Sequence, residues 1–194
     1  MNYCQRFLDE IEEIASLINE NEIEAMVQEL VALRERHGRL FIFGLGGSAA
    51  NASHAVNDFR KLCGIEASTP TDNVAELTAR ANDEGWRHIF SEWLDFDPAQ
   101  NYNDDAILIL SVGRGTDIVS VPIVSVIGEA QANLMTILGI VGRDGGETAK
   151  YANCCIVIPT IVQERVTPHT EAFQSVILHC IVSHPDLQRN KTKW

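Results

Sequence analysis

A short apolar segment that runs into a glycine-rich turn is the feature that most constrains the fold of this chain. Residues 40–43 read as a buried strand, and Gly46 and Gly47 allow a tight turn before Ser48 begins a helix. The first amide groups of a helix are unpaired and carry partial positive charge, which suits a phosphate group. Neither the dinucleotide-binding fingerprint nor the GxxxxGK[ST] phosphate loop matches. The turn therefore predicts an anion site at the carboxyl end of a strand, with a purely structural turn as the alternative.

Apolar strands and amphipathic helices alternate along most of the chain. Helices are expected at residues 3–19, 21–37, 48–63, 73–94 with a break at 82–85, 122–133 and 147–151, and strands at 40–43, 106–112, 135–141 and 154–158. Continuous apolar strands that alternate with helices predict a parallel sheet covered on both faces. No repeat, low-complexity segment or linker interrupts residues 1–194, so a single domain is expected.

The helix that follows the glycine turn has two separate faces. Its apolar face is expected to pack on the sheet, and Asn51, His54, Asp58 and Lys61 form a polar stripe roughly opposite. A solvated surface is the simpler interpretation of such a stripe. His54 and Asp58, however, are one turn apart, so both side chains can reach a single metal ion or substrate.

A second group of polar residues lies in a mostly apolar helix near the C-terminus. Thr167 is expected to cap this helix, with Pro168 at its first position. Glu171, Ser175 and His179 share one narrow stripe of it. Burial of a carboxylate and an imidazole without partners costs several kcal/mol, so these groups should be paired, bound to a metal or exposed to a cleft. A histidine with a structural role in the core is the alternative.

The charge and the cysteines exclude several classes of protein. A formal net charge of −12 argues against nucleic acid or an anionic membrane as the main partner. The five cysteines are odd in number and contain no CxxC pair, which favours reduced thiols in a cytoplasmic protein. The N-terminus has no apolar signal-peptide core, and no apolar run reaches the length of a membrane span. A protein of the cytoplasm that is not exported is therefore expected.

Taken in order along the chain, these motifs resemble a known family. The glycine–serine loop followed by His54, the Asn82-Asp83 pair, the turn at residues 141–146 and the Glu171/His179 helix are similar to the sugar isomerase (SIS) domain of phosphoheptose isomerases. The resemblance covers nearly the whole chain. It implies a flavodoxin-like α/β/α sandwich with a five-stranded parallel sheet, assembled as a homotetramer with active sites between subunits. Residues 1–37 would then be N-terminal helices used in oligomerisation.

The resemblance also implies an activity and a metal. The family interconverts sedoheptulose 7-phosphate and D-glycero-D-manno-heptose 7-phosphate, which supplies heptose for lipopolysaccharide or capsule. By position, the family's metal-site histidine falls on His54 and its catalytic histidine on His179. Asp58 stands where the family has a catalytic glutamate, and Glu171 where it has a glutamine. All four side chains would hold one zinc ion, or another divalent metal ion, per active site, with Asp58 and His179 as the acid/base pair.

Substrate contacts are expected in several loops, and the phosphate loop departs from the family. That loop is rich in serine and threonine in the family, whereas here it reads Ser111-Val-Gly-Arg-Gly-Thr116, so the Arg114 side chain would replace lost hydrogen bonds. Phosphate would be held by Ser48, Ser111 and Thr116. The full set of expected substrate residues is Gly46, Gly47, Ser48, Asn82, Asp83, Ser111, Gly113, Arg114, Thr116 and Glu171.

Two other functions remain open at this point. One is a non-catalytic SIS-fold protein that binds a phosphosugar as a regulator or scaffolds other proteins. The other is an isomerase for a different phosphosugar, such as a hexose phosphate. The acid/base residues distinguish an isomerase from the first alternative, because a pure binding protein does not need a Glu–His stripe that faces His54 and Asp58.

Overall fold

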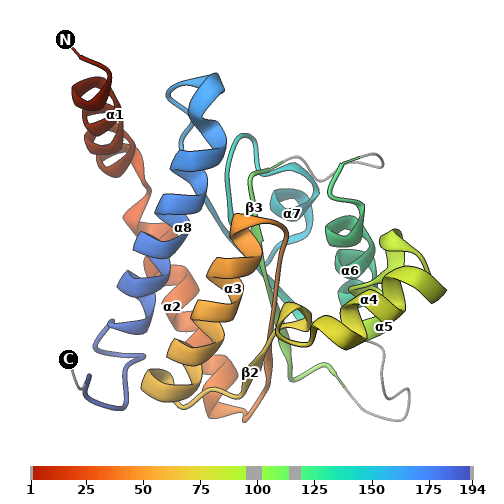
Figure 1. The fold of residues 1–194 in the computed structure, drawn as a ribbon. Helices are drawn as coiled ribbons and strands as arrows, with labels where there is room; N and C mark the ends of the chain where they lie inside the picture. The colour runs from red at the N-terminus through yellow and green to blue at the C-terminus, as the bar shows by residue number, and fades with distance from the viewer. Residues whose placement is uncertain (1, 95–101, 114–118, 193–194) are drawn as a thin grey trace.

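A five-stranded, all-parallel sheet forms the centre of the computed structural model, which describes residues 2–94, 102–113 and 119–192 (Figure 1). The strands are β1 (Leu40–Gly44), β2 (Ala67–Ser68), β3 (Ala106–Ser111), β4 (Thr136–Val141) and β5 (Cys154–Val157), in the order β2-β1-β3-β4-β5. This order is that of flavodoxin-like folds, whose ligands bind where the chain reverses direction along the sheet, beside the first strand. The fold class expected from the sequence is confirmed.

Helices cover both faces of the sheet because successive strand residues point to opposite sides. The helices are α1 (Tyr3–Leu17), α2 (Glu20–Glu35), α3 (Gly47–Asp58), α4 (Val74–Asp83), α5 (Ser91–Leu94), α6 (Val121–Ala132), α7 (Gly146–Tyr151) and α8 (Val166–Val182), with short helical turns at Phe59–Cys63, Pro70–Asp72, Trp86–His88 and Gln163–Arg165. Leu40 and Ile42 of β1 pack in the core under α2, α3 and α8, whereas Phe41 and Phe43 pack in a second core under α5 and α6. The sheet thus places α3 and α8 together on one face.

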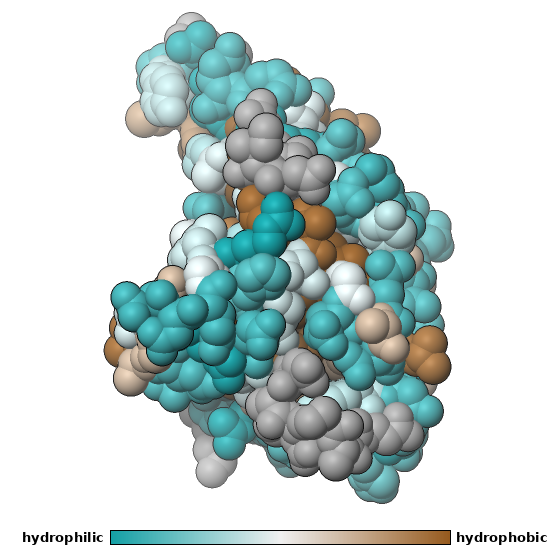
Figure 2. Space-filling view, turned by 90° about the vertical axis from the view of Figure 1, so that its right-hand side faces the viewer, coloured by the Kyte–Doolittle hydropathy of each residue, from teal (hydrophilic) through white to brown (hydrophobic). Residues whose placement is uncertain are grey.

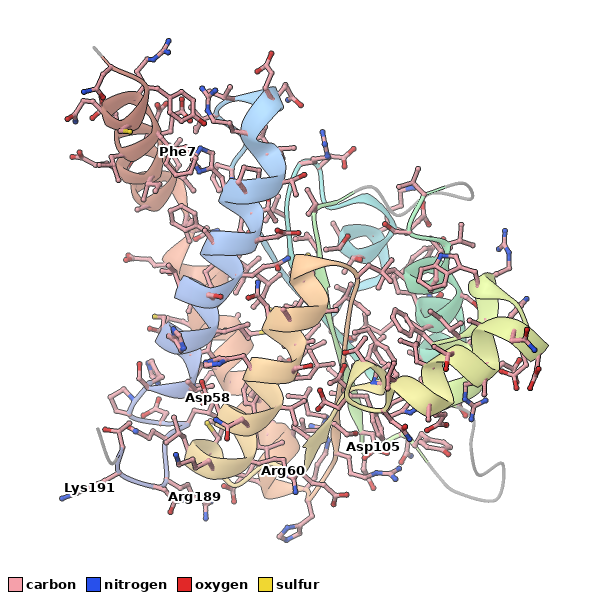
Figure 3. The ribbon with its side chains drawn as sticks, in the orientation of Figure 1. Phe7, Asp58, Arg60, Asp105, Arg189 and Lys191 are labelled. Atoms are coloured by element: carbon pink, nitrogen blue, oxygen red, sulfur yellow. The ribbon has the colours of Figure 1, made fainter. Side chains whose placement is uncertain are left out.

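The N-terminal helix α1 reaches past the sheet and is tied to the start of α8 (Figures 1 and 3). The Glu10 carboxylate accepts a hydrogen bond from Arg165 Nε at 2.7 Å and lies 2.8 Å from His169 Nε2. The hydrogen bonds from Arg165 and then His169 lower the pKa of Glu10 to about 2. The ring of Phe7 lies 4.5 Å from that of His169. A charged and an aromatic contact therefore fix α1 against α8.

Three details differ from the sequence expectation. The helix expected to run to residue 63 ends at Asp58 and continues as a π-turn over Phe59–Cys63, because the amide of Gly64 bonds to the Phe59 carbonyl five residues back. The two-residue edge strand β2 was not predicted. The cap of α8 is Arg165 instead of Thr167, and Pro168 lies in the first turn, where its missing N–H breaks no bond.

The surface agrees with the acidic composition. Figure 2 shows that the side of the molecule that carries α4 to α6 is mostly hydrophilic. On α4, Arg80 pairs with Glu76 at 2.9 Å and with Glu84 at 3.3 Å, one helical turn to either side. Among the described helices, none combines the length and the apolarity needed to cross a membrane.

Candidate active site

The glycine turn after β1 brings the chain tightly back over the strand. A side chain on Gly44 would collide with the backbone of Ser48, and Gly46 has a φ of 61°, in the left-handed region that favours glycine. The Ser48 side chain, in the first turn of α3, is 1% exposed, and its hydroxyl has no hydrogen-bond partner among the described residues. A buried hydroxyl without a partner is unfavourable unless a ligand or water completes it.

Polar side chains join α3 to α8 along a seam that starts at this turn. The Glu171 carboxylate lies against Gly47, so a side chain at position 47 would collide with it. One turn further along α3, Asn51 Nδ2 donates to the Glu171 carbonyl at 2.8 Å and to Gln174 Oε1 at 3.1 Å, and its Oδ1 accepts from the Ser175 hydroxyl at 2.8 Å. The simpler interpretation of the polar stripe on this helix as solvated surface is therefore wrong for Asn51, because Asn51 faces α8.

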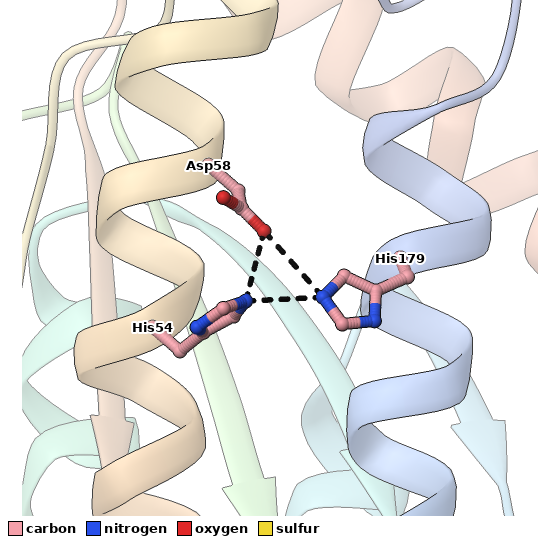
Figure 4. A group of neighbouring side chains, drawn as sticks. All are labelled: His54, Asp58 and His179. Carbon is pink, nitrogen blue, oxygen red and sulfur yellow. Dashed lines mark hydrogen bonds and ion pairs between the residues drawn. The ribbon is translucent and has the colours of Figure 1, made fainter. Parts of the chain in front are cut away.

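Three side chains converge further along the same seam (Figure 4). His54 Nε2 lies 3.1 Å from Asp58 Oδ2 and 3.0 Å from His179 Nε2, and the Asp58 oxygen is 3.7 Å from His179 Nε2. Asp58 also accepts from Asn57 Nδ2 at 2.9 Å. The spacing on α3 and the stripe on α8 predicted these residues, and the structure brings them together between the two helices (Figure 4).

The geometry of this cluster suits a tetrahedral metal ion. Two imidazole nitrogens and one carboxylate oxygen are the ligand types that zinc takes in catalytic sites. With ligand bonds of 2.0–2.1 Å, neighbouring ligand atoms of a tetrahedral zinc are roughly 3.3 Å apart, and the three observed separations lie on both sides of that value. The Asp58 side chain is 6% exposed, whereas those of His54 and His179 are 56% and 57% exposed, so solvent reaches the two imidazoles and not the carboxylate.

Glu171 does not join this cluster within one copy of the chain. It precedes His179 by eight residues on α8, which is about 12 Å along the helix axis at 1.5 Å per residue. The group of metal-binding side chains within 4.8 Å of one another contains His54, Asp58 and His179. The four-residue metal set expected from the sequence is therefore reduced to three in a single chain, because two turns of helix separate Glu171 from the others.

Two pockets lie at the ends of this seam. The first, of about 200 Å³, lies at the carboxyl ends of the strands; its walls are Leu45, Ser48, Ser111, Val112, Val119, Ser120, Arg143 and Thr167. The second, of about 490 Å³, lies beside the His–Asp–His cluster and is lined by Asp58, Leu62, His179, Val182, Ser183, Gln188 and Thr192. The expected phosphate residues Ser48 and Ser111 therefore share one pocket, and the expected acid/base pair borders the other.

The remaining expected residues are placed as follows. The Gly113 amide donates to the Ser111 hydroxyl oxygen at 3.2 Å, at the start of the loop that was expected to bind phosphate. Arg114 and Thr116 lie outside the described residues. Asn82 and Asp83 are exposed at the end of α4, where Asn82 Nδ2 donates to Asp83 Oδ1 at 2.7 Å, and neither lines the two pockets.

Sequence reasoning missed two residues that the structure places at the site. Gln174 is fully buried, and its amide nitrogen lies 3.3 Å from the Ser111 carbonyl and 3.4 Å from that of Ile140, so it links α8 to two strand ends. No pattern singles it out, because it stands in an apolar part of the helix. Arg143 borders the first pocket. The sequence did single out the turn at residues 141–146 that contains Arg143, but only as a motif that supports the family resemblance.

Comparisons with known proteins point to one family. A scan against protein-family models gave no match. The chain is 32% identical over 179 residues to the phosphoheptose isomerase of Sulfurimonas denitrificans, a match that covers 87% of this chain and 86% of that protein. The structure of a phosphoheptose isomerase from Francisella tularensis superposes with a TM-score of 0.75 at 20% identity, over 94% of this chain and 97% of that one.

The same fold also occurs in a protein solved with a sugar phosphate bound. The Vibrio vulnificus NanR protein, solved in complex with ManNAc-6P, superposes with a TM-score of 0.65 at 10% identity, over 92% of this chain and 59% of that one. Likeness at this level shows the fold alone. The fold by itself therefore does not separate an enzyme from a phosphosugar-binding protein, and the residues of the site have to do so.

Proposed function

The chain belongs to the phosphoheptose isomerase family and is an aldose–ketose isomerase of that type, and on this premise we propose that it interconverts sedoheptulose 7-phosphate and D-glycero-D-manno-heptose 7-phosphate. The product would supply heptose for lipopolysaccharide or capsule. The observation that carries this proposal is the convergence of His54, Asp58 and His179 beside a pocket, on the seam that begins at the glycine turn.

Asp58 and His179 are proposed to move the protons. Conversion of the ketose to the aldose removes a proton from C1, passes through a cis-enediolate and returns a proton to C2, while the oxygens on C1 and C2 exchange the hydroxyl proton. This exchange requires a base and an acid on the same side of the substrate. The Asp58 carboxylate and the His179 imidazole are 3.7 Å apart, and both line the second pocket. They meet the requirement for a pair that acts on adjacent atoms.

His54, Asp58 and His179 are also proposed to hold a divalent metal ion, with zinc as the expected ion. When bound, such an ion would polarise a carbonyl and stabilise negative charge on oxygen. For the chain's own residues, we propose that the buried Asp58 orients both imidazoles, since its Oδ2 atom lies 3.1 Å from His54 Nε2 and 3.7 Å from His179 Nε2. Glu171 is proposed as a substrate-binding side chain because it lies at Gly47, at the other end of the seam.

The phosphate is proposed to bind at the first pocket. Ser48 and Ser111 line it, and Gly46 and Gly47 lie between its lining residues Leu45 and Ser48 in the chain. In the sequence, Gly113, Arg114 and Thr116 follow Ser111. Ser48 and His54 are six residues apart on α3, or about 9 Å along its axis. An extended heptose phosphate has six carbon–carbon bonds of about 1.5 Å plus its ester link, so its length is of the same order. A substrate of this size would reach from the phosphate pocket to the acid/base pair.

The assembly and the cell compartment are proposals as well. Residues 1–194 would form one SIS domain, with 1–37 used in oligomerisation and a homotetramer as the working form. In support, the α1 side chains of Tyr3, Leu8 and Leu17 are more than half exposed although they are apolar. The two exposed imidazoles of the cluster would then be covered by a neighbouring subunit, which agrees with sites between subunits. Asn82 and Asp83 would meet substrate only in that assembly. A cytoplasmic location fits the five free cysteines.

A coupled assay of sedoheptulose 7-phosphate isomerisation tests the proposal. The protein is treated with a chelator and assayed with and without added zinc, alongside a His54→Ala variant. Turnover that depends on zinc in the wild-type protein and is lost in the variant is the expected result. A folded, zinc-loaded protein that turns over a hexose phosphate but no heptose phosphate would contradict the substrate. One that binds sugar phosphates without turnover would favour the regulator.

A further inference from the structure

The Arg143 side chain lines the first pocket, and its guanidinium group has few hydrogen-bond acceptors among the described residues. The residue follows β4 and lines the pocket beside Ser48 and Ser111. Its Nε atom is buried and has no hydrogen-bond partner among the described residues. Its Nη1 atom donates to Gln163 Oε1 at the long distance of 3.4 Å. A buried donor of a charged group is unfavourable without an acceptor, so an acceptor is expected from outside the described chain.

The backbone at Arg143 also argues against a purely structural role. Its φ of 55° lies in the left-handed region, which carries a steric cost for any residue with a side chain beyond glycine. One long hydrogen bond to an exposed glutamine stabilises the protein too little to offset that steric cost. Strained positions of this kind concentrate at binding sites, where the direction of the side chain matters.

Close packing of two loops sets the guanidinium beside the hydroxyl groups. A side chain on Gly113 would overlap the carbonyl oxygen of Gly142, and the Gly142 amide donates to the Ser111 carbonyl at 3.1 Å. The loops after β3 and β4 therefore touch backbone to backbone, directly before Arg143. The Ser111 hydroxyl accepts from Gly113 and keeps its own proton to donate. The Ser48 hydroxyl, also buried, has no partner among the described residues.

The pocket so formed has the chemistry of an anion site. It combines a cation with the hydroxyl groups of Ser48 and Ser111, and its volume of about 200 Å³ is several times the ~30 Å³ share of a water molecule. With a net charge of −12, the overall field of the protein repels an anion, so binding has to come from local donors. An arginine is well suited to this, because its planar fork binds phosphate through two parallel hydrogen bonds.

We propose that Arg143 binds the phosphate group of the substrate, together with Ser48 and Ser111. The identity of the ligand as a phosphosugar rests on the proposed function. The assignment of Arg143 as the charged residue of the pocket rests on its own geometry. Arg143 is a binding residue in this proposal and takes no part in proton transfer.

Binding of inorganic phosphate by the full chain tests the proposal, measured by calorimetry in Arg143→Asn, Arg143→Lys and Lys150→Gln. Asparagine tolerates the left-handed backbone, so Arg143→Asn removes the guanidinium without added strain. It should weaken phosphate binding about tenfold or more, as loss of a charged hydrogen bond does. Arg143→Lys should retain part of the affinity. Lys150→Gln removes the same charge from the exposed face of α7 and should bind phosphate as the wild type does.

Further measurements separate this proposal from a structural role and from the proposed function. If Arg143 acts on the ligand, Arg143→Asn should have a urea midpoint no lower than that of the wild type, because it removes a buried donor without a partner, and it should keep the wild-type zinc affinity. Unchanged phosphate affinity in Arg143→Asn, or an equal loss in Lys150→Gln, would overturn the proposal, as would a wild-type protein that binds no phosphate. Phosphate binding that depends on Arg143 without isomerase turnover would uphold it and reject the proposed function. If the wild type turns over substrate and Arg143→Asn leaves the KM unchanged, the proposed function stands and the assignment of Arg143 is rejected.

Discussion

Replacement of Ser48 by alanine should raise the stability of the protein while it weakens phosphate binding. The Ser48 hydroxyl is buried, with the residue 1% exposed, and has no partner among the described residues. A buried polar group left without a hydrogen bond costs about 1–3 kcal/mol, and water in the adjoining pocket moves the value toward the lower end. Ser48→Ala should therefore add about 1 kcal/mol to the free energy of unfolding. For a chain of this size that corresponds to about 2–4 °C in Tm.

The same change should reduce the stabilisation that phosphate provides. A hydrogen bond to a charged group contributes about 1.5–3 kcal/mol, so loss of one should raise the Kd for phosphate about tenfold or more. At a phosphate concentration one hundred times the wild-type Kd, ligand binding adds about 2.7 kcal/mol to the wild-type protein. With a Kd ten times higher it adds about 1.4 kcal/mol. Urea unfolding of both proteins, with and without phosphate, measures all four values.

Ser91→Ala is the matched control. Ser91 is also buried, but its hydroxyl lies 3.2 Å from the His88 carbonyl and 2.9 Å from the Ser125 hydroxyl, so its removal should cost roughly 1 kcal/mol and leave phosphate binding unchanged. The reasoning would be refuted if Ser48→Ala lost as much stability as Ser91→Ala, or if phosphate stabilised Ser48→Ala as strongly as the wild type.

Three further predictions concern other parts of the molecule. Asp58→Asn and His179→Ala should each lower turnover at least about a hundredfold in the coupled assay at saturating zinc, and normal turnover in either would remove that residue from the proton transfer. Because the ion pairs of Glu10 lower its pKa from 4.5 to about 2, they stabilise the fold fully above pH 4.5 and lose this effect as the pH falls toward 2. The gap in urea midpoint between the wild type and Glu10→Gln should therefore narrow over that range, and a gap that does not change with pH would contradict the assignment. Gly113→Ala should lower the free energy of unfolding by about 2 kcal/mol or more, because the φ of Gly113 is 86° and a methyl group there would overlap Gly142. Gly128 lies in open space on α6, so Gly128→Ala should raise the free energy of unfolding by up to about 1 kcal/mol in the same measurement. Equal effects at the two glycines would contradict the packing described.

The sequence predicted those parts of the site that depend on spacing within one helix. His54 and Asp58 are four residues apart, so any α-helix places them on one side. Glu171, Ser175 and His179 lie on one stripe for the same reason. That the two stripes face each other follows from α3 and α8 packing side by side on one face of the sheet. No pattern within either helix contains that information.

The parts that were missed depend on contacts between distant segments. Glu171 is the exception: the family resemblance assigned it to the same ion as His179, although eight residues, or about 12 Å along a helix, separate the two. Arg143 lines the pocket because Gly113 and Gly142 touch, a contact between two loops 29 residues apart. The strand β2 has only two residues, Ala67 and Ser68, which is too short for an apolar pattern, and its pairing with β1 alone defines it.

Because of the π-turn at Phe59–Cys63, the site should tolerate an insertion or deletion just after Asp58 better than one just before it. A π-turn holds one residue more than an α-turn, and this one begins directly after Asp58. Deletion of the exposed Lys61 would convert it into an ordinary turn without moving His54 or Asp58, which precede it. The same deletion between Ser48 and His54 would rotate the His54 and Asp58 side chains by about 100° around α3, away from His179. Among natural or engineered variants, single-residue gains and losses should therefore accumulate just after Asp58 and be absent just before it.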